Sequence, residues 1–426
     1  LKYRGYPIGR PEITGSVDLF HEDEGVPGIG SFQSRRARFE RARILSQIGL
    51  SGYGLAWPDV ESSLRFFHSF QQDSFRDPEG EIGVGVQNTR DRTHRLGVDG
   101  LAALYGYGFP NNVFTVTTRL TGERFSPLDE VALEDAPDAD RGAVEAAVEE
   151  EYQLPSRGVT LLASVSVEHA ETNLRGAASR DRSDTLASPR AGVRWDALPG
   201  LSLRANAGRF YRIPTFLELF GNTGTILGNP GLEPESGWST DLGARYQLIP
   251  LWLVEVTGFF RDTDDLIVFE QNSQRTSIAM NVSRARALGV ELSASGRVRW
   301  VDLEGNFTFQ DLEDRSRVPF LRGNDLPGRP RRQGFGRASV AQLPVEPFFE
   351  VDFTGANFLD RANLVKAPSR IILNAGAGFD AGGLVVWLAG LRALLELKNL
   401  TDNRILDVAG FPLPSRSVFG SLTYEF

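Results

Sequence analysis

Hydrophobic and polar residues alternate along most of this chain, in segments of about ten to fourteen residues. Between Val301 and Gln310, for example, apolar residues such as Leu303 and Phe307 occupy every second position, and polar residues such as Glu304 lie between them. A period of two places successive side chains on opposite faces of a β-strand. The pattern therefore predicts a chain built almost entirely of strands.

Extending this interpretation along the chain gives about eighteen strands. They cover residues 11–20, 41–51, 62–71, 94–107, 112–125, 142–154, 159–172, 187–197, 201–212, 236–248, 251–270, 278–295, 299–313, 331–342, 346–358, 368–379, 384–398 and 416–426. The connections mostly alternate in length: His21–Glu40 is long, for example, and Gly108–Asn111 is short. Membrane-spanning β-barrels combine short turns at one end with long loops at the other. A soluble sandwich has no reason to keep this asymmetry, so the pattern favours a transmembrane antiparallel β-barrel in one domain, residues 1–426.

Tryptophan positions and the last strand support the same architecture. Trp195, Trp252, Trp300 and Trp387 lie near short turns, as expected for indoles in the headgroup region on one side of a membrane. The final segment alternates up to Phe426, and closure of a barrel requires this strand to pair with the first one. Tryptophans in other all-β proteins also flank turns, so neither feature decides the fold alone.

Composition removes several classes of function. The net charge is −9 and the pI about 5.2, so no basic surface for nucleic acid is expected. The chain has no cysteine, which excludes disulfides, thiolate metal sites and cysteine nucleophiles. The mean hydropathy of −0.22 remains compatible with a barrel, because only every second residue of a spanning strand faces lipid.

One proline-rich region carries a specific motif. Its residues are Tyr211, Arg212, Pro214, Thr215, Glu218, Leu219, Gly228, Asn229, Pro230, Leu232, Pro234 and Glu235. The region resembles a signature of the TonB-dependent receptors, F-R-x-P-T-x-x-E-L followed by G-N-P-x-L-x-P-E, with tyrosine in place of the first phenylalanine. Proline fixes φ and removes a backbone donor, so the prolines indicate a rigid loop. Glu218 and Glu235 are placed to pair with a nearby arginine such as Arg212.

Shorter matches to the same family follow along the chain. Gly289, Val290 and Glu291 resemble its G-V-E strand. Asn399, Leu400 and Asp402 resemble its N-L-x-D entry to the last hairpin, and Arg416 follows Pro-Ser where the family has Pro-Gly. The resemblance spans most of the chain, and we interpret these residues as architectural.

The resemblance implies a complete protein with a plug inside a barrel of about 22 strands. Neither a plug nor a TonB-binding segment is recognised here, so we expect both, with the first strands, to precede Leu1. The implied function is import of a scarce nutrient, such as a ferric siderophore or cobalamin, across the Gram-negative outer membrane with energy supplied through TonB. The implied partners are this nutrient, outer-membrane lipid and lipopolysaccharide, the TonB complex and the barrel assembly machinery. No enzymatic activity, cofactor or metal site is expected.

Arginines provide the candidate ligand-binding residues. Arg35, Arg36, Arg331 and Arg332 lie in loops or near strand ends, where they would attract an anionic ligand. Ordinary lumen charges balanced by carboxylates, or contacts with lipopolysaccharide phosphates, explain such arginines equally well. The four histidines, His21, His68, His94 and His169, lack metal-ligand spacing. His21 and His169 are placed where they could contact a ligand such as haem, but such histidines are more often solvated loop or lumen residues.

Two other functions stay open from the sequence. A naturally plugless barrel would be a passive pore that conducts without an energy source. An outer-membrane hydrolase would need a Ser-His-acid arrangement, whose members are distant in sequence, but no Gly-x-Ser-x-Gly motif is present.

Overall fold

The computed structural model describes most of the chain. The described residues are 2–5, 11–26, 34–55, 57–82, 85–131, 138–175, 180–221, 226–249, 251–271, 277–340, 345–384, 390–404, 406–408, 411–412 and 414–424. They fall into two units: unit 1 contains Leu1–Val193, Asn206–Ser239 and Thr263–Ser283, and unit 2 contains Arg194–Ala205, Thr240–Asp262 and Arg284–Phe426.

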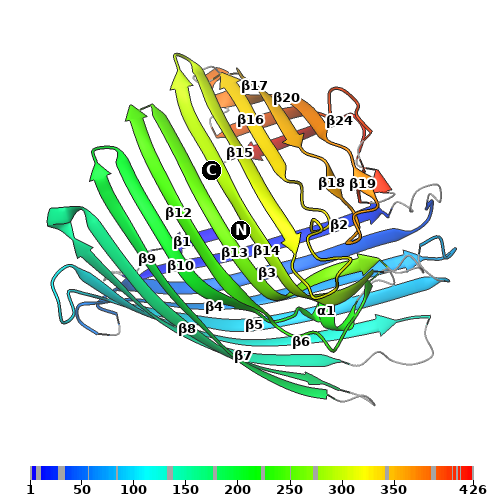
Figure 1. Cartoon of the computed structure of the whole chain (residues 1–426), viewed down its shortest axis with the longest axis horizontal. Coiled ribbons are helices and arrows are strands. Elements are labelled where there is room, and N and C mark those ends of the chain that lie inside the picture. Colours follow the sequence, from blue (N-terminus) through cyan, green and yellow to red (C-terminus); the bar gives the residue numbers. More distant parts are fainter. Residues whose placement is uncertain are drawn as a thin grey trace. The chain divides into compact units, whose positions relative to one another are not determined.

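Each of the eighteen predicted strands corresponds to a long strand within the described residues. These are β2 (Glu12–Gly25), β3 (Arg38–Tyr53), β4 (Val60–Asp77), β5 (Gln87–Tyr105), β6 (Asn112–Asp129), β7 (Ala139–Leu154), β8 (Val159–Leu174), β9 (Arg180–Leu198), β10 (Leu201–Arg212), β12 (Glu235–Ile249), β13 (Trp252–Gln271), β14 (Ser277–Val298), β15 (Val301–Asp314), β16 (Arg332–Val340), β17 (Val345–Thr354), β20 (Arg370–Asp380), β21 (Leu391–Lys398) and β24 (Ser417–Tyr424). The all-β fold is therefore confirmed (Figure 1).

The remaining elements are short. They are β1 (Lys2–Gly5), β11 (Ile226–Leu227), β18 (Asn357–Phe358), β19 (Lys366–Ala367), β22 (Leu406–Val408), β23 (Phe411–Pro412), a 3-10 turn (Pro155–Arg157), α1 (Phe216–Phe220) and α2 (Ala381–Leu384).

Several strands extend beyond the predicted bounds at their long-loop ends. β4 reaches Asp77 instead of residue 71, and β5 begins at Gln87 instead of residue 94. Apolar alternation stops before these ends, but the backbone pairing continues. Polar side chains maintain it, as in the ion pair between Arg41 Nε and Asp73 Oδ1 at 2.8 Å. Hydrophobic pattern alone therefore underestimates the strand length.

In unit 1, β1 to β8 form an antiparallel meander with two unlike faces. Directly paired residues project to the same side of a sheet. One cross-strand row runs Ile48, Phe66, Val98, Leu120 and Val144, and we call this side the apolar face. The adjacent row runs Arg65, Asp99, Arg119, Glu145 and Glu168, and we call that side the charged face.

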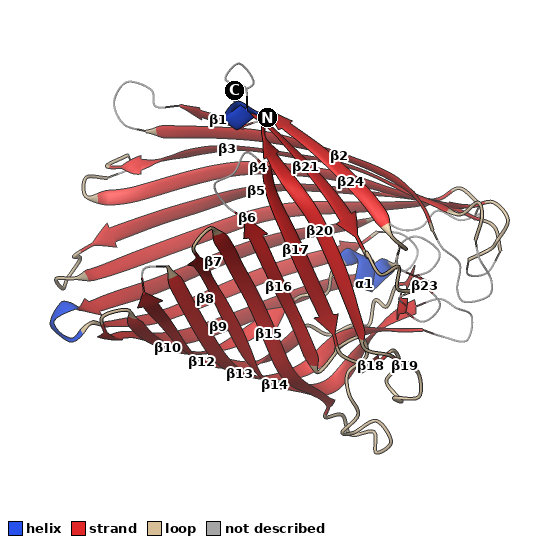
Figure 2. Ribbon diagram, turned by 90° about the horizontal axis from the view of Figure 1, so that it is seen from above, coloured by secondary structure: helices blue, strands red, loops and turns tan. Residues whose placement is uncertain are grey.

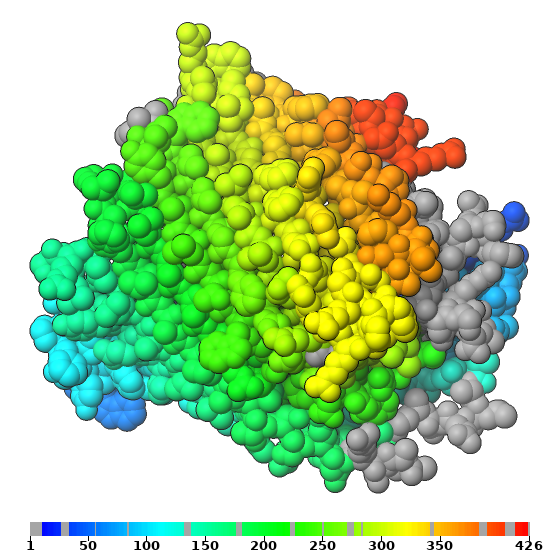
Figure 3. Space-filling view, in the orientation of Figure 1, coloured from blue at the N-terminus to red at the C-terminus, as the bar shows by residue number. Residues whose placement is uncertain are grey.

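Unit 2 contains a second antiparallel meander. From the paired part of β14, it continues through β15, β16, β17, β20, β21 and β24, and Figure 2 shows several of these strands side by side. Yellow and orange atoms in Figure 3 mark the side chains of its middle strands. On β14, Leu288, Val290 and Leu292 share one face and are exposed by 53%, 41% and 45%.

Among the described residues, three small clusters of buried apolar side chains lie at the long-loop ends of unit 1. The mid-strand apolar residues are instead largely exposed, including Leu96 at 61% and Val144 at 51%. No described helix is long and apolar enough to cross a membrane. A sheet face covered with exposed large apolar side chains requires an apolar surrounding, which lipid provides for a spanning strand.

Candidate functional site

The loop that follows β10 begins with a self-capped helix. Pro214 is buried and ends the strand, and Thr215 caps α1. The Thr215 hydroxyl oxygen accepts a hydrogen bond from the Glu218 amide at 3.3 Å, and the Glu218 carboxylate accepts one from the Thr215 amide at 2.7 Å. This reciprocal capping box satisfies donors that an exposed helix end would leave to water.

Arg212 joins the two ends of this loop. Its Nη1 and Nη2 donate to the Glu218 carboxylate at 2.8 and 3.0 Å. Its Nε and Nη2 donate to the Glu235 carboxylate at 3.0 and 2.7 Å. The predicted pairing is therefore confirmed for both glutamates. We call Arg212, Glu218 and Glu235 the loop anchor. Each carboxylate accepts two hydrogen bonds from the guanidinium, and such bidentate contacts are the strongest between arginine and a carboxylate.

The anchor lies in a shielded environment. The side chains of Glu218 and Glu235 are only 10% and 7% exposed. Glu235 also accepts a hydrogen bond from the backbone amide of Ile267 on β13 at 2.8 Å. Charges at this depth are stable only when they are paired and hydrogen-bonded, and these carboxylates are both.

The stability that the anchor gives to the loop depends on pH through the Glu218 carboxyl. Burial raises the pKa of this carboxyl, but the hydrogen bonds from Arg212 and Thr215 outweigh burial and hold the pKa below its usual 4.5. A carboxyl with a lowered folded-state pKa contributes stability above its unfolded-state pKa and loses that contribution as the pH falls through the folded value. The loop should therefore be protected from amide hydrogen exchange at pH 6 and lose protection below pH 4.5, after correction for the intrinsic rate. Unchanged protection at pH 3 would contradict this assignment.

Apolar packing holds α1 against the strands. Phe216 stacks on Phe125 of β6 with a ring-centroid distance of 5.7 Å. Arg141 of β7 lies over the Phe216 ring at 4.7 Å and donates to the Pro214 carbonyl at 2.9 Å. Leu219 packs in a second cluster with Leu232, Ile267 and Ala279. The helix is therefore fixed to the wall of unit 1.

The second half of the loop is equally fixed. A Cβ at Gly228 would lie 2.2 Å from the Phe220 carbonyl carbon, so only glycine permits this close approach. The Asn229 amide donates to the Glu218 carbonyl at 2.9 Å, and its side-chain nitrogen donates to the Ala279 carbonyl at 2.9 Å. Pro230 lies in a turn after Asn229, and Pro234 precedes β12.

Three anchoring residues were not identified from the sequence. Arg141 is described above, Arg182 of β9 donates to the Leu232 carbonyl, and the Asn281 side chain donates to the Glu233 carbonyl at 3.0 Å. Each acts on a residue about 50 to 70 positions away along the chain. No local pattern marks such a contact, because only strand pairing brings the partners together.

The charged face of unit 1 carries a row of alternating charges. Asp99 accepts from Arg65 Nε at 2.9 Å and from Arg119 Nε at 2.8 Å. Arg119 also lies 3.8 Å from Glu145, whose cross-strand partner is Glu168. A polar, charge-balanced face opposite an apolar one is the arrangement of a barrel wall between lumen and lipid.

Two of the four predicted ligand-binding arginines belong to unit 1. The backbone amides of Arg35 and Arg36 donate to the carboxylate of Glu81 at 2.9 Å, which fixes this loop. The Arg36 guanidinium pairs with Glu79 at 2.8 Å, with both side chains largely exposed. Among the described residues, no carboxylate pairs with the Arg35 guanidinium. Arg35 thus presents an uncompensated charge.

The other two arginines belong to unit 2. Arg331 pairs with Asp325 at 2.7 Å and with Asp311 at 3.1 Å, so its charge is already balanced. The Arg332 guanidinium lies 5.8 Å from the centroid of the Phe309 ring. Arg35 and Arg36 therefore come together on one loop, and Arg331 and Arg332 at the start of one strand.

All four histidines lie on strands, so their interpretation as loop residues was wrong. Strand pairing places His21, His68, His94 and His169 on the apolar face of unit 1, beside Ala42, Leu96, Phe70 and Val144. The sequence alone did not reveal this arrangement, because each histidine lies on a different strand. In the part of the chain that the structure describes, no group of three or more His, Cys, Asp or Glu residues is arranged to hold a metal ion.

The chain matches the family described as "TonB dependent receptor-like, beta-barrel" over residues 4–400. It belongs to this family. The match contains all strands from β2 to β21, and with them the loop anchor and the charged face. The resemblance stated from the motifs is thereby confirmed.

Solved structures of TonB-dependent receptors share the fold. A copper transporter, OprC, is 14% identical with a TM-score of 0.80, over 100% of this chain and 70% of that one. The unliganded ferric citrate transporter FecA is 15% identical with a TM-score of 0.80, over 100% and 69%. The siderophore receptor PiuA from Acinetobacter baumannii is 12% identical with a TM-score of 0.78, over 97% and 72%. Identities this low establish the fold and leave the substrate open.

Within this TonB-dependent receptor barrel, Gly289 has a packing role in unit 2. A Cβ there would lie 2.5 Å from the Phe259 ring and 2.7 Å from the Phe309 carbonyl oxygen. The ring of Phe259 therefore covers a glycine on the neighbouring strand, an arrangement that shields the backbone. Val290 faces the opposite side from Gly289 and Glu291, as alternation requires.

The motif near the C-terminal end of the receptor barrel closes a turn. Asn399 is buried, and its amide donates to the Asn374 side chain at 3.0 Å. The Leu400 amide donates to the Leu373 carbonyl at 2.8 Å. The Asp402 carboxylate accepts from the Arg416 amide at 2.9 Å, which links the turn to β24. Phe426 lies outside the described residues.

Proposed function

We propose that this chain is the greater part of an outer-membrane receptor that binds a scarce nutrient and imports it with energy delivered through TonB. The family match over residues 4–400 carries the proposal. The two unlike faces of unit 1 support it, because one suits lipid and the other a water-filled lumen. The family and the similar solved structures are transporters or receptors, and we infer no reaction for this chain.

The proposed cellular setting is the Gram-negative outer membrane. Its lipids would surround the apolar face, and the barrel assembly machinery would insert the strands. The TonB complex would act through a plug and a TonB-binding segment. Nucleic acid is not a proposed partner, given the net charge of −9.

The rigid loop anchor supports a receptor with a preorganised extracellular rim. Binding to a fixed surface costs less conformational entropy than binding to a mobile loop. The anchor fixes the segment between β10 and β12 by two arginine–carboxylate forks and two apolar clusters. We assign it a positioning role, with no direct contact to the ligand.

The uncompensated charge of Arg35 supports one class of ligand. An anionic chelate, such as a ferric siderophore, is attracted by cations without bound carboxylates more than by balanced pairs. Neutral chelates such as cobalamin would not respond to them. We therefore propose an anionic metal chelate as the ligand, with Arg35 contributing.

Replacement of Arg35 by glutamine should weaken binding of such an anionic ligand by about twofold to fivefold, as expected for loss of one exposed charge contact. The matched change Arg331→Gln should have a smaller effect, because Arg331 is balanced by Asp325 and Asp311. Binding of radiolabelled chelates to intact cells measures both. Equal losses in the two variants would contradict the assignment.

A panel of ligands tests the function itself. Cells that carry the full-length protein as their only receptor would be offered anionic ferric siderophores, ferric citrate, a copper complex and cobalamin. We expect saturable binding of one anionic chelate and none of cobalamin. Unsaturable passage of every small solute, with ion conductance in a planar bilayer, would instead show a passive pore.

A further inference from the structure

A pair of carboxylates lies at the long-loop end of unit 1, on the charged face. Asp73 of β4 and Asp91 of β5 are direct cross-strand partners, so both side chains project to the same side. The two residues are only 9% and 6% exposed. Like charges directly opposite one another destabilise a sheet, and burial adds to the cost because it removes water from both groups.

Arg41 compensates one member of the pair. Asp73 accepts a hydrogen bond from Arg41 Nε at 2.8 Å and another from Gln71 Nε2 at 2.9 Å. The Oδ2 atom of Asp91 is buried without a hydrogen-bond partner, and among the described residues no cation forms an ion pair with this carboxylate. A buried carboxyl without such partners is more stable as the neutral acid.

The charges that face Asp91 are mostly negative. Asp73 faces it from β4, and Asp129 projects to the same side from β6. Arg41 of β3 lies behind Asp73, and its own cross-strand partner is Glu22 of β2. Burial, followed by the charges of Asp73 and Asp129, raises the pKa of the Asp91 carboxyl from 3.8 to about 7.

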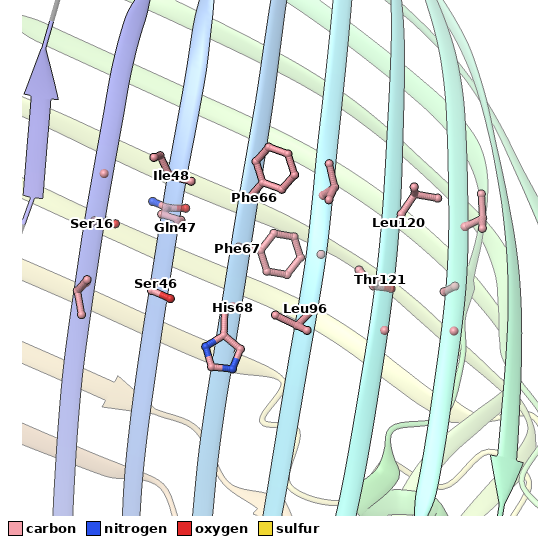
Figure 4. A pocket seen from close by; sticks show the side chains of 18 of the residues that line it. Ser16, Ser46, Gln47, Ile48, Phe66, Phe67, His68, Leu96, Leu120 and Thr121 are labelled. Atoms are coloured by element: carbon pink, nitrogen blue, oxygen red, sulfur yellow. The ribbon is translucent and has the colours of Figure 1, made fainter.

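The pair lies beyond the apolar zone of the sheet. Figure 4 shows Ile48, Phe66 and Leu120 of that zone on neighbouring strands. The residues that flank Asp73 and Asp91 project to the opposite side and are all polar: Gln72, Ser74, Arg90 and Arg92. Polar side chains on both faces place this part of the strands outside the hydrocarbon, where water can take up or supply a proton.

The loop between β4 and β5 packs against the same end of the sheet. Phe75 of β4 is the direct partner of Thr89, the neighbour of Asp91 on this face, and it packs with Ile82 of the loop. The Ile82 amide donates to the buried Asp77 carboxylate at 2.6 Å. The packing of this loop therefore depends on the spacing of β4 and β5.

The same loop holds the segment that carries Arg35. The Glu81 carboxylate accepts hydrogen bonds from the backbone amides of Arg35 and Arg36, both at 2.9 Å. Ala37 packs in the cluster that contains Ile82. A change in the spacing of β4 and β5 therefore reaches residues 34–37 through Glu81 and Ile82.

We propose that Asp91 is a proton switch: its neutral form allows the outer ends of β4, β5 and β6 to close, and its ionised form separates them and loosens the segment that carries Arg35. One proton passes from the carboxyl to water on opening and returns on closing, so no other reactant is required. The consequence for ligand binding rests on the proposed function, whereas the switch itself does not.

The direction of the response follows from the raised pKa. A carboxyl with a raised pKa in the closed form destabilises that form as the pH rises from 3.8 toward about 7. Opening should therefore increase by more than about tenfold between pH 5.5 and 7.5. Amide hydrogen exchange at Ile82 and Arg36 measures it in the full-length protein in lipid vesicles, after correction for the intrinsic rate. The Leu219 amide is the internal control, because the pKa of Glu218 in its loop lies below 4.5.

Two variants identify the titrating group. Asp91→Asn keeps the shape of the side chain but cannot ionise, so we expect equal protection of Ile82 at pH 5.5 and 7.5. Histidine is the other side chain that ordinarily titrates in this range, and His94 lies on the opposite face of β5. His94→Gln should therefore keep the wild-type increase. An increase that persists in Asp91→Asn, or that disappears in His94→Gln, would overturn the proposal.

Infrared difference spectra of the wild type provide a test that does not depend on the folding of a variant. Between pH 5.5 and 7.5 the carbonyl band of a protonated carboxyl should disappear, and its absence at pH 5.5 would overturn the proposal. Neither measurement uses a ligand. Failure of every chelate to bind would refute only the proposed function, and exchange at Ile82 that does not change with pH would refute only the switch.

Discussion

Replacement of Arg212 by methionine should destabilise the loop between β10 and β12 by about 3 kcal/mol. The change leaves two shielded carboxylates, Glu218 and Glu235, without their common partner. Removal of one member of a buried ion pair typically costs about 3–5 kcal/mol, and the 38% exposure of Arg212 places the effect at the lower end. Amide hydrogen exchange at Leu219 and Asn229 should accelerate roughly a hundredfold.

Two further variants show whether the charges are responsible. Arg194→Met breaks an exposed pair with Asp196 and should change exchange in the loop by less than twofold or so. Adding Glu218→Gln and Glu235→Gln to Arg212→Met should recover part of the protection, because no unpaired charge then remains. Failure of the triple variant to recover any protection would indicate that Arg212 acts through packing alone.

Replacement of Ala146 by arginine should destabilise the folded protein in a bilayer by about 2–4 kcal/mol. Ala146 lies on the apolar face between Val144 and Val148, and its cross-strand partners are Thr118 and Val167. A guanidinium at this position would have to enter the hydrocarbon or distort the lipid around it. Urea titration of the full-length protein folded into lipid vesicles measures the loss.

The adjacent residue provides the control. Ala147 projects to the charged face beside Thr117 and Ser166, so an arginine there remains in polar surroundings. Ala147→Arg should change stability by no more than about 0.5 kcal/mol. Equal losses in the two variants would mean that β7 does not separate lipid from lumen.

Alternation in the sequence was sufficient to locate the long strands because a spanning strand alternates its environment at every residue. It failed at strand ends such as Gln87, where pairing continues after the apolar pattern stops. The alternation also gave no sign that the four histidines lie on the same face of the sheet, where the strand register places them. Register depends on turns and long-range pairing, which a single-sequence pattern does not fix.

In the loop after β10, local contacts were likewise predictable from the sequence and distant contacts were not. Pairing of Glu218 and Glu235 with a nearby arginine such as Arg212 was expected from the sequence, and the structure contains it. The supports from Arg141 and Arg182 were not predictable, since both come from strands far away in the sequence. Balance of Arg331 by carboxylates was an open alternative, but its partners Asp311 and Asp325 could not be named, because they meet it only in the folded loop.

Energy coupling is the most direct test of the proposed function. Cells that carry the full-length protein as sole receptor would be loaded with its radiolabelled chelate, with TonB present or deleted. We expect surface binding in both strains and accumulation inside only when TonB is present. Equal accumulation in the strain without TonB would contradict an energised receptor and establish passive passage.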